Sequence, residues 1–197
     1  MKFLVVGSTG LIGSYVAKTL SKHGTVIGVS RTTQISVDVK DPASIKVMYE
    51  KVGKVDAVAS CIGKVAFKPV AELTYEDYLM GLKDKALGQV ELVRAGIDFL
   101  NDGGSFTLMT GVLARDPIPA GSVAALANGA IESFTLAAAI DLPRGIRINT
   151  VSPNVLVEAT SYHASFPGFH QVTAQSVADA YVKSILGKQT GQIYKLD

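Results

Sequence analysis

Apolar segments of strand length alternate along the whole chain with segments in which apolar residues recur three and four positions apart. Segments that are apolar on both faces are typical of a parallel sheet, because helices cover both sides of such a sheet. We therefore expect an α/β fold over residues 1–197, with one Rossmann-type, doubly wound parallel sheet in a single domain.

The pattern predicts about seven strands, in the sheet order 3-2-1-4-5-6-7. Because the interval between Val29 and Ile35 is too short for a helix, the third strand is expected to follow a loop at the sheet edge. The expected strands are Lys2–Val6, Thr25–Val29, Ile35–Val37, Val55–Ser60, Gly104–Met109, Arg147–Val151 and Gln192–Lys195. The expected helices are Leu11–Lys22, Pro42–Lys51, Tyr75–Leu100, Ser122–Asp141 and Ala174–Leu186.

A glycine-rich turn links the first strand to the first helix. Glycine permits a sharp turn, the approach of a phosphate to the backbone, and close packing of the helix on the sheet. The helix N-terminus adds free N–H groups and the positive end of a dipole. The turn therefore predicts a dinucleotide site formed by Gly7, Ser8, Thr9, Gly10, Leu11, Ile12 and Gly13.

Composition excludes several classes of function. The chain has 197 residues and a formal net charge of +2, so we expect neither nucleic acid nor a membrane surface as partner. No apolar run is long enough to span a bilayer, and no signal-peptide pattern is present. The single cysteine, Cys61, cannot form an internal disulfide, which fits a cytoplasmic protein. The scattered histidines and this cysteine lack metal-ligand spacing, so no metal is expected.

Further landmarks follow the glycine turn in a fixed order. They are Asp38-Val39, Ser60-Cys61-Ile62-Gly63, Gly104-Ser105, the segment from Leu142 to Asn154, and Thr190-Gly191-Gln192. The fourth is similar to the PRGIRVNAVAPG segment of the short-chain dehydrogenase/reductase family, and the fifth is similar to that family's TGQ. The chain thus resembles this family over nearly its whole length. The resemblance implies a nicotinamide dinucleotide cofactor and a carbonyl or alcohol substrate.

The end of the second strand indicates which cofactor binds. Relatives that use NAD usually carry an acidic residue there, whereas this chain has Ser30 and Arg31. A cation at that point favours the 2′-phosphate of NADP(H), so we expect NADP(H) to be preferred over NAD(H). The alternative is that Arg31 is a solvated loop residue.

The resemblance also places other residues along the cofactor. Asp38 and Val39 match the family's adenine contact, although Asp38 is alternatively a turn acceptor. Cys61 is expected to be a small buried residue beside the nucleotide rather than a reactive thiol. The remaining expected contacts are Ser60, Ile62, Gly63, Pro153, Asn154 and Val155.

The resemblance fails at the catalytic residues. Members of the family use a tyrosine as proton donor, a lysine that lowers its pKa, a serine that orients the substrate, and an asparagine that holds a water. The segment 128–134 matches the family's KAGLEGF, which places Asn128 at the lysine and Ala124 at the tyrosine. The serine position falls on Gly111 and the asparagine position on Lys85. The usual proton route therefore cannot operate.

Four residues remain as catalytic candidates. Lys85 is expected near the empty tyrosine position, with a lowered pKa, as the proton donor; the alternative is a helix lysine paired with an acid or extended to solvent. Thr110 and Ser122 offer hydroxyls to a substrate, or are strand-end and helix-cap residues. Tyr162 lies in the loop that closes over substrate in relatives, where aromatic side chains also pack the loop down.

Two functions are compatible with these residues. The first is an NADP(H)-dependent oxidoreductase that acts on a small-molecule carbonyl or alcohol, with a non-standard proton donor. The alternative is a non-catalytic NADP(H)-binding redox sensor on the same fold; isomerisation on a bound cofactor is a weaker third. The resemblance further implies a homodimer or homotetramer paired through helices 75–100 and 122–141, unless these faces cover the sheet of a monomer.

Overall fold

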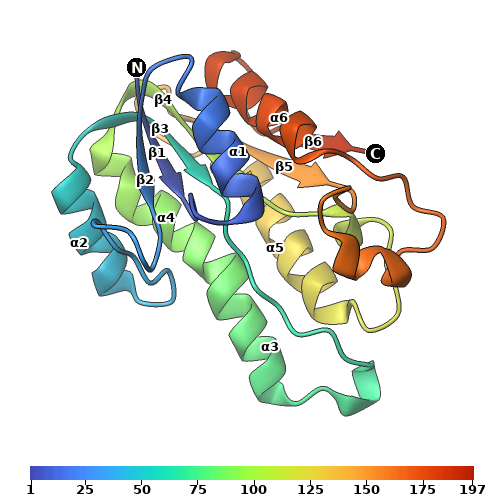
Figure 1. The fold of residues 1–197 in the computed structure, drawn as a ribbon. Coiled ribbons are helices and arrows are strands. Elements are labelled where there is room, and N and C mark those ends of the chain that lie inside the picture. Colours follow the sequence, from blue (N-terminus) through green and yellow to red (C-terminus); the bar gives the residue numbers. More distant parts are fainter.

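A parallel sheet runs through the computed structural model, which describes residues 1–197. Its six strands lie in the order β2-β1-β3-β4-β5-β6, with helices on both faces (Figure 1), so the predicted doubly wound α/β fold is confirmed. The strands are β1 (Lys2–Val6), β2 (Thr25–Val29), β3 (Val55–Ser60), β4 (Leu100–Met109), β5 (Arg147–Pro153) and β6 (Ile193–Leu196). The α-helices are α1 (Leu11–Leu20), α2 (Pro42–Val52), α3 (Tyr75–Gly81), α4 (Gly88–Gly96), α5 (Ser122–Ala138) and α6 (Ala174–Leu186).

Strand residues alternate between two apolar clusters, one on each face of the sheet. Phe3 and Val5 of β1 pack with residues of α1 and α6. Leu4 and Val6 pack with residues of α2, α4 and α5. Successive side chains of a strand point to opposite faces, so a continuous apolar strand is buried on both sides. This burial fixes the carboxyl ends of the strands, where the site lies.

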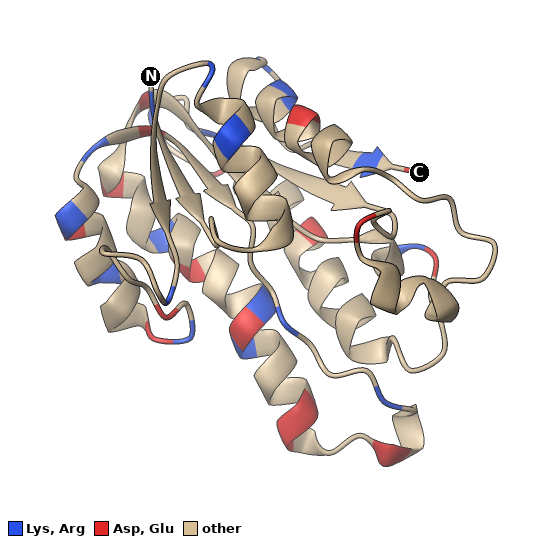
Figure 2. Cartoon of the chain, in the orientation of Figure 1, with Lys and Arg blue, Asp and Glu red and all other residues tan.

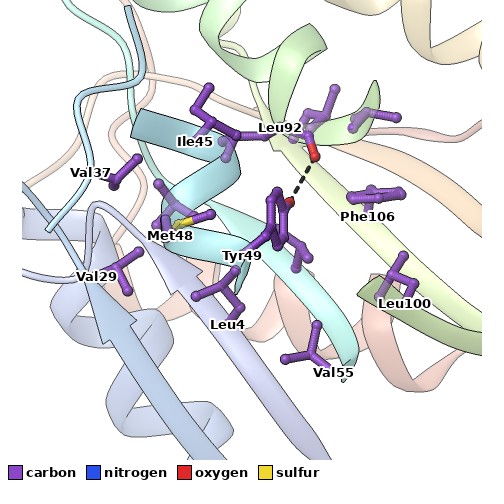
Figure 3. Close-up of a cluster of buried hydrophobic side chains, with 14 of the residues drawn as sticks. Leu4, Val29, Val37, Ile45, Met48, Tyr49, Val55, Leu92, Leu100 and Phe106 are labelled. Atoms are coloured by element: carbon purple, nitrogen blue, oxygen red, sulfur yellow. Dashed lines mark hydrogen bonds between the residues drawn. The ribbon is translucent and has the colours of Figure 1, made fainter. Parts of the chain in front are cut away.

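Tyr49 joins α2 to α4 within the second of these clusters (Figure 3). Its hydroxyl donates to the carbonyl oxygen of Leu92 at 2.7 Å, and its ring stacks on Phe99 with 5.2 Å between centroids. Burial disfavours the phenolate and raises the pKa of Tyr49 far above its usual value. Tyr49 is therefore a structural residue, with its one polar atom satisfied.

The predicted third strand at Ile35–Val37 is wrong. That segment forms only an isolated bridge between Ser30 and Ser36, so the sheet has one strand fewer than expected. The physical reason is competition from side chains. The Ser30 amide donates to the Thr33 hydroxyl at 2.7 Å, and the Thr32 amide donates to the Ser30 hydroxyl at 3.1 Å. These local bonds hold the segment in turns in place of a strand ladder.

The long helix predicted for Tyr75–Leu100 is interrupted. Its path contains α3, the π-helix η2 (Leu82–Leu87), α4 and the short 3₁₀ helix η3 (Ile97–Phe99), and Leu100 already belongs to β4. A π-helical turn widens the backbone and leaves carbonyl groups for other donors, a feature often found at functional sites. Lys85 lies in this π-helical turn.

The other element boundaries shift by a few residues. The helices α1 and α5 end at Leu20 and Ala138, earlier than predicted, whereas β5 extends to Pro153. No helix is long and apolar enough to cross a membrane.

Candidate functional site

Two adjoining cavities open along the carboxyl ends of β1 to β5. The glycine-side cavity, of about 370 Å³, is lined by the glycine turn, the end of β2 and the segment 37–40. The lysine-side cavity, of about 350 Å³, is mostly apolar and contains Lys85. Both share the segment that follows β3, which consists of Cys61, Ile62, Gly63 and Lys64. Their junction makes one elongated cleft at the place where doubly wound folds bind ligands.

The turn needs its three glycines for different reasons. Gly7 has a φ of +84°, and a Cβ there would lie 2.6 Å from the carbonyl oxygen of Cys61. A Cβ on Gly13 would lie 2.0 Å from the carbonyl oxygen of Gly7. The protein's own backbone therefore excludes side chains at both positions. At Gly10 the nearest atom would be 3.4 Å away, so that glycine keeps space open on the cavity side.

The start of α1 offers donors to an anion. Gly10 caps the helix without a side-chain bond, and its own amide donates to the carbonyl of Gly7 at 3.0 Å. The amides of Leu11, Ile12 and Gly13 have no backbone acceptor. Free N–H groups at the positive end of a helix dipole are suited to a phosphate. Of the predicted turn residues, Ser8, Leu11 and Gly13 do not line either cavity themselves.

The segment after β2 places two cations at the glycine-side cavity. Arg31 and Lys40 both line it, and Arg31 is exposed with no hydrogen bond or ion pair to the protein. Ser30, Asp38 and Val39, which the sequence predicts as cofactor contacts, line the same cavity. The Asp38 carboxylate accepts from the Lys40 amide at 3.1 Å, so it also serves as a turn acceptor.

Ser60, the last residue of β3, is buried and does not reach the cleft. The Ser60 carbonyl oxygen accepts from the Tyr181 hydroxyl at 2.5 Å, while its own hydroxyl has no partner and reaches neither cavity. Burial raises the pKa of the Cys61 thiol to about 12. A thiol that stays protonated is a poor nucleophile, although Cys61 is half-buried and lines both cavities.

Lys85 lies in the lysine-side cavity with its aliphatic part against Gly63. A Cβ on Gly63 would lie 2.5 Å from the Lys85 Cγ. The ammonium forms no hydrogen bond or ion pair with the protein. Desolvation by burial lowers the pKa of Lys85 to about 8, and nearby Asp84 opposes this shift. The Lys85 side chain is half-buried and forms part of the cavity wall.

Gln89 holds the backbone on both sides of this cavity and was not predicted from the sequence. Its amide nitrogen donates to the carbonyl oxygens of Lys85 at 3.0 Å and Met109 at 2.8 Å. Its amide oxygen accepts from the Met109 amide at 2.8 Å. A fully buried glutamine thus fixes the spacing between Lys85 and the end of β4. The signal was weak, because a glutamine at this point of an amphipathic helix looks like a surface residue.

Thr110 follows β4 and lines the lysine-side cavity, but its hydroxyl is already engaged. It donates to the Glu132 Oε1 atom at 3.0 Å. The Ser152 hydroxyl donates to the same oxygen at 3.0 Å, and the Arg115 guanidinium donates to the Ser152 hydroxyl at 2.8 Å. Arg115 also pairs with Asp197. Sequence reasoning missed Glu132 because its partners come from distant segments.

Asn128 is buried on α5 and lines the lysine-side cavity beside Ala124. Its amide nitrogen donates to the Gly111 carbonyl at 3.3 Å, whereas its Oδ1 atom has no partner. An unsatisfied acceptor beside a cavity is suited to a hydroxyl donor from a ligand.

The other candidates lie around the rim or outside the cavity. Pro153, Asn154 and Val155, which the sequence predicts as cofactor contacts, line the lysine-side cavity. Tyr162 lines it from the 3₁₀ helix η5 (Thr160–Ser165), half-exposed, with its ring 6.0 Å from Phe67. Ser122 is the first residue of α5 but does not reach the cavity, and its buried hydroxyl has no partner. The structure thus brings together Lys85, Thr110 and Tyr162 and leaves Ser122 apart.

Comparison with known proteins gives a match to a protein family and to individual relatives. The family model described as Enoyl-(Acyl carrier protein) reductase matches residues 10–191. An uncharacterized oxidoreductase from Methylorubrum extorquens is 24% identical over 190 residues, which cover 84% of this chain and 77% of that protein. A hydroxynaphthalene reductase from Aspergillus fumigatus is 26% identical over 76% of this chain and 64% of its own length. This chain therefore spans less than two thirds of that reductase.

Solved structures of similar length match throughout. The protein lin1944 from Listeria innocua is 49% identical, with a TM-score of 0.98 and full coverage of both chains, each at 100%. A small-chain dehydrogenase crystallised in complex with NADPH is 27% identical, with a TM-score of 0.89 over 100% of this chain and 96% of that one.

Proposed function

The chain belongs to the short-chain dehydrogenase/reductase family of NAD(P)-dependent oxidoreductases, and from that premise we propose that it acts on a small carbonyl or alcohol compound with NADP(H). The proposed proton route uses no tyrosine. The observation that carries this proposal is the elongated cleft, in which a dinucleotide-binding turn at one end adjoins an apolar cavity with an unpaired lysine at the other.

The residues present fit a dinucleotide. The free amides at the start of α1 and the space beside Gly10 suit the pyrophosphate. The unpartnered Oδ1 atom of Asn128 suits a sugar hydroxyl. A bound nicotinamide cofactor supplies or accepts the hydride, and this chain's residues position the partner and handle charge and protons.

The preference for NADP(H) is proposed from Arg31. Its guanidinium is free of protein partners and lies with Lys40 at the glycine-side cavity. Two cations there would bind a 2′-phosphate through charge-assisted hydrogen bonds. The small-chain dehydrogenase that was crystallised with NADPH supports this choice by likeness.

We propose that the ammonium of Lys85 faces the negative charge that develops on the substrate oxygen. A cation in a largely apolar cavity acts strongly on such a charge, because little water screens it. The sequence also predicts that Lys85 donates the proton itself, and this second role stays a prediction. Replacement by arginine separates the two roles, because arginine keeps the charge but does not release a proton.

A homodimer or homotetramer paired through helices 75–100 and 122–141 is proposed from exposed apolar residues. Leu126 and Leu136 of α5 and the following Ile140 are exposed, as are Tyr75 and Met80 of α3. Figure 2 shows α5 almost without charged residues. A helix face of this kind is typical of a protein–protein contact.

The experiment is a titration of the purified protein with NADPH and with NADH, followed by nicotinamide fluorescence, beside the variant Arg31→Ala. We expect NADPH to bind more tightly, and the variant to lose about tenfold to a hundredfold for NADPH with little change for NADH. Arg94→Ala, on the exposed surface of α4, is the matched control. Equal weakening for both nucleotides would remove the preference, and binding of neither would remove the proposed function.

The alternative function is an NADP(H)-binding redox sensor. The observation that favours it is the pair Ala124 and Asn128 in the lysine-side cavity, where relatives are expected to carry catalytic residues. Tight NADPH binding without turnover across a broad panel of carbonyl compounds and alcohols would support the sensor.

A further inference from the structure

We propose that the substrate of the cleft is a 2-oxo acid with an apolar body, and that its carboxylate pairs with the ammonium of Lys85. The inference rests on the proposed oxidoreductase function and adds the substrate class to it. The observation behind it is the charge of the lysine-side cavity, whose wall contains two cations and no acidic residue.

The two cations are Lys64 and Lys85, and the side chain of neither forms an ion pair or a hydrogen bond with the protein. Most of the remaining wall is apolar, so it does little to offset their charge. Desolvation is costly for a cation unless an anion meets it, and this cost appears in the lowered pKa of Lys85. The cavity is thus suited to a negatively charged ligand.

Two carboxylates lie close to this cavity, but neither lines it. Asp84 acts on the charge of Lys85 without forming an ion pair, and it accepts from the Lys64 amide at 2.8 Å beside the glycine-side cavity. The Glu132 carboxylate accepts from two hydroxyl donors of the protein, each at 3.0 Å. Both acids therefore leave the lysine-side cavity without a negative charge.

The phosphates of a dinucleotide account for Lys64 but not for Lys85. Lys64 lines both cavities, so it borders the glycine-side cavity, where the pyrophosphate is proposed to bind. Lys85 lines the lysine-side cavity alone, with its aliphatic part against Gly63 at the border between the two. The anion that pairs with Lys85 therefore comes from the other ligand, the substrate.

One ammonium can bind a carboxylate and a reacting carbonyl oxygen together when the two groups are bonded to each other. A lysine ammonium has three N–H donors and no acceptor. In a planar 2-oxo acid the keto oxygen and one carboxylate oxygen face the same side, so both can accept from Lys85. The ammonium then holds the carboxylate on binding and stabilises the oxyanion during reduction, which is the role already proposed for it.

Aromatic and aliphatic side chains provide room for the body of the substrate. Phe67, Tyr162 and Phe166 line the lysine-side cavity, as do Val65 and Leu113. A cavity of about 350 Å³ is at the small end of ligand pockets, so it suits a single ring or a branched alkyl group. An apolar body buried there adds hydrophobic binding, while the carboxylate fixes the orientation.

The reaction balances as a two-electron reduction. The keto carbon gains the hydride of the reduced nicotinamide cofactor that the proposed function supplies, and the electron pair of the C=O π bond moves to oxygen. That oxygen gains a proton from solvent, so a 2-hydroxy acid forms and the carboxylate is unchanged.

The test compares two 2-oxo acids, benzoylformate and 4-methyl-2-oxopentanoate, with their neutral methyl esters as substrates for reduction by NADPH. We expect the wild type to give a kcat/KM about tenfold to a hundredfold higher for each acid than for its ester. In Lys85→Met this preference should disappear, and the acid-to-ester ratio measures it even where total turnover falls.

Two further variants control this comparison. Lys85→Arg keeps a cation that can pair with a carboxylate, so it should keep the preference for the acids. Lys83→Met lies in the same π-helical turn, but residue 83 is exposed and lines neither cavity. This variant should leave the acid-to-ester ratio unchanged.

Calorimetry provides a measurement that does not depend on turnover. Benzoylformate is titrated into the complex of the protein with NADP⁺, which cannot reduce it, near pH 8, the pKa of Lys85. A carboxylate beside Lys85 favours the ammonium, so binding should take up a proton, which is measured in two buffers of different ionisation enthalpy. The methyl ester should show no such uptake, and neither should Lys85→Met with either ligand.

The outcomes separate this inference from the proposed function. Equal or better reduction of the esters by the wild type, or an acid preference that persists in Lys85→Met, would overturn the inference. Failure of both acids to bind would also overturn it, and reduction of neutral ketones would then leave the oxidoreductase standing. If benzoylformate binds with proton uptake through Lys85 but NADPH reduces no carbonyl compound, the carboxylate site stands and the oxidoreductase function falls.

Discussion

The two cavities of the cleft share a border but differ in what their residues require. At the glycine-side cavity, backbone geometry fixes the turn that borders it, since side chains on Gly7 and Gly13 would collide with backbone oxygens. In the lysine-side cavity, the proposed chemistry depends instead on side chains, among them Lys85, Thr110 and Asn128. Backbone requirements leave a strong mark on a sequence, whereas a side-chain network can be rebuilt from other residues. One half of the site is thus readable as a motif and the other is not.

The largest effect of a substitution is expected at Gly13, in the glycine turn. We expect Gly13→Ala to abolish NADPH binding and to lower the melting temperature, because the added Cβ would lie 2.0 Å from a carbonyl oxygen that cannot move without unfolding the turn. Thermal denaturation and NADPH titration measure both effects.

Gly129→Ala on α5 is the matched control. A Cβ there meets nothing within 4 Å, so the substitution should raise the free energy of unfolding by about 0.5–1 kcal/mol through helix propensity. Normal NADPH binding by Gly13→Ala would refute the role assigned to the turn.

The lysine-side cavity is tested next by Lys85→Met. We expect about a hundredfold loss of turnover at neutral pH, because the cavity loses its half-buried cation. In the wild type, turnover should fall as pH rises through about 8, where Lys85 loses its proton, and this decline should be absent from the methionine variant. Retention of activity by Lys85→Arg would favour the charge role over proton donation.

The free energy of unfolding provides a second test of Lys85→Met. The pKa of Lys85 is lowered on folding from 10.5 to about 8, so the unfolded chain binds the proton more strongly between these values. Wild-type stability should therefore gain from Lys85 as pH rises across this window, and the burial penalty is largest below it. Lys85→Met should be more stable than the wild type at neutral pH, with the difference narrowing towards pH 10.5. A constant difference in stability would contradict the desolvation of the Lys85 ammonium on folding.

The contrast between backbone and side-chain requirements also explains which features could be predicted from the sequence. The strand–turn–helix of Gly7 to Gly13, the sheet order apart from its edge strand, and most element positions were predictable, because periodicity and glycine requirements are local. The segment 35–37 was misjudged because hydroxyls of Ser30 and Thr33 capture the backbone. Glu132 and Gln89 were missed because their roles exist only once β4, β5, α4 and α5 are packed together.

A smaller effect is expected on the outer face of α5, away from both cavities. Leu136→Glu places a charge in the proposed pairing face, which should reduce the apparent molecular mass in light scattering towards that of a monomer. NADPH affinity should stay within about twofold, because Leu136 lines neither cavity. A monomeric wild-type protein would contradict the proposed pairing through helices 75–100 and 122–141.

The smallest effect is expected at Tyr162, and it sharpens the boundary of the lysine-side cavity. Its ring contacts Phe67 across the cavity mouth, and its hydroxyl has no protein partner. We expect Tyr162→Phe to change kcat by less than about twofold, since the apolar contact survives. Tyr162→Ala should raise KM more than it lowers kcat, because the mouth loses an apolar wall that binds substrate equally before and during reaction. A large loss of kcat in Tyr162→Phe, with KM unchanged, would instead make the phenol the proton donor in place of Lys85.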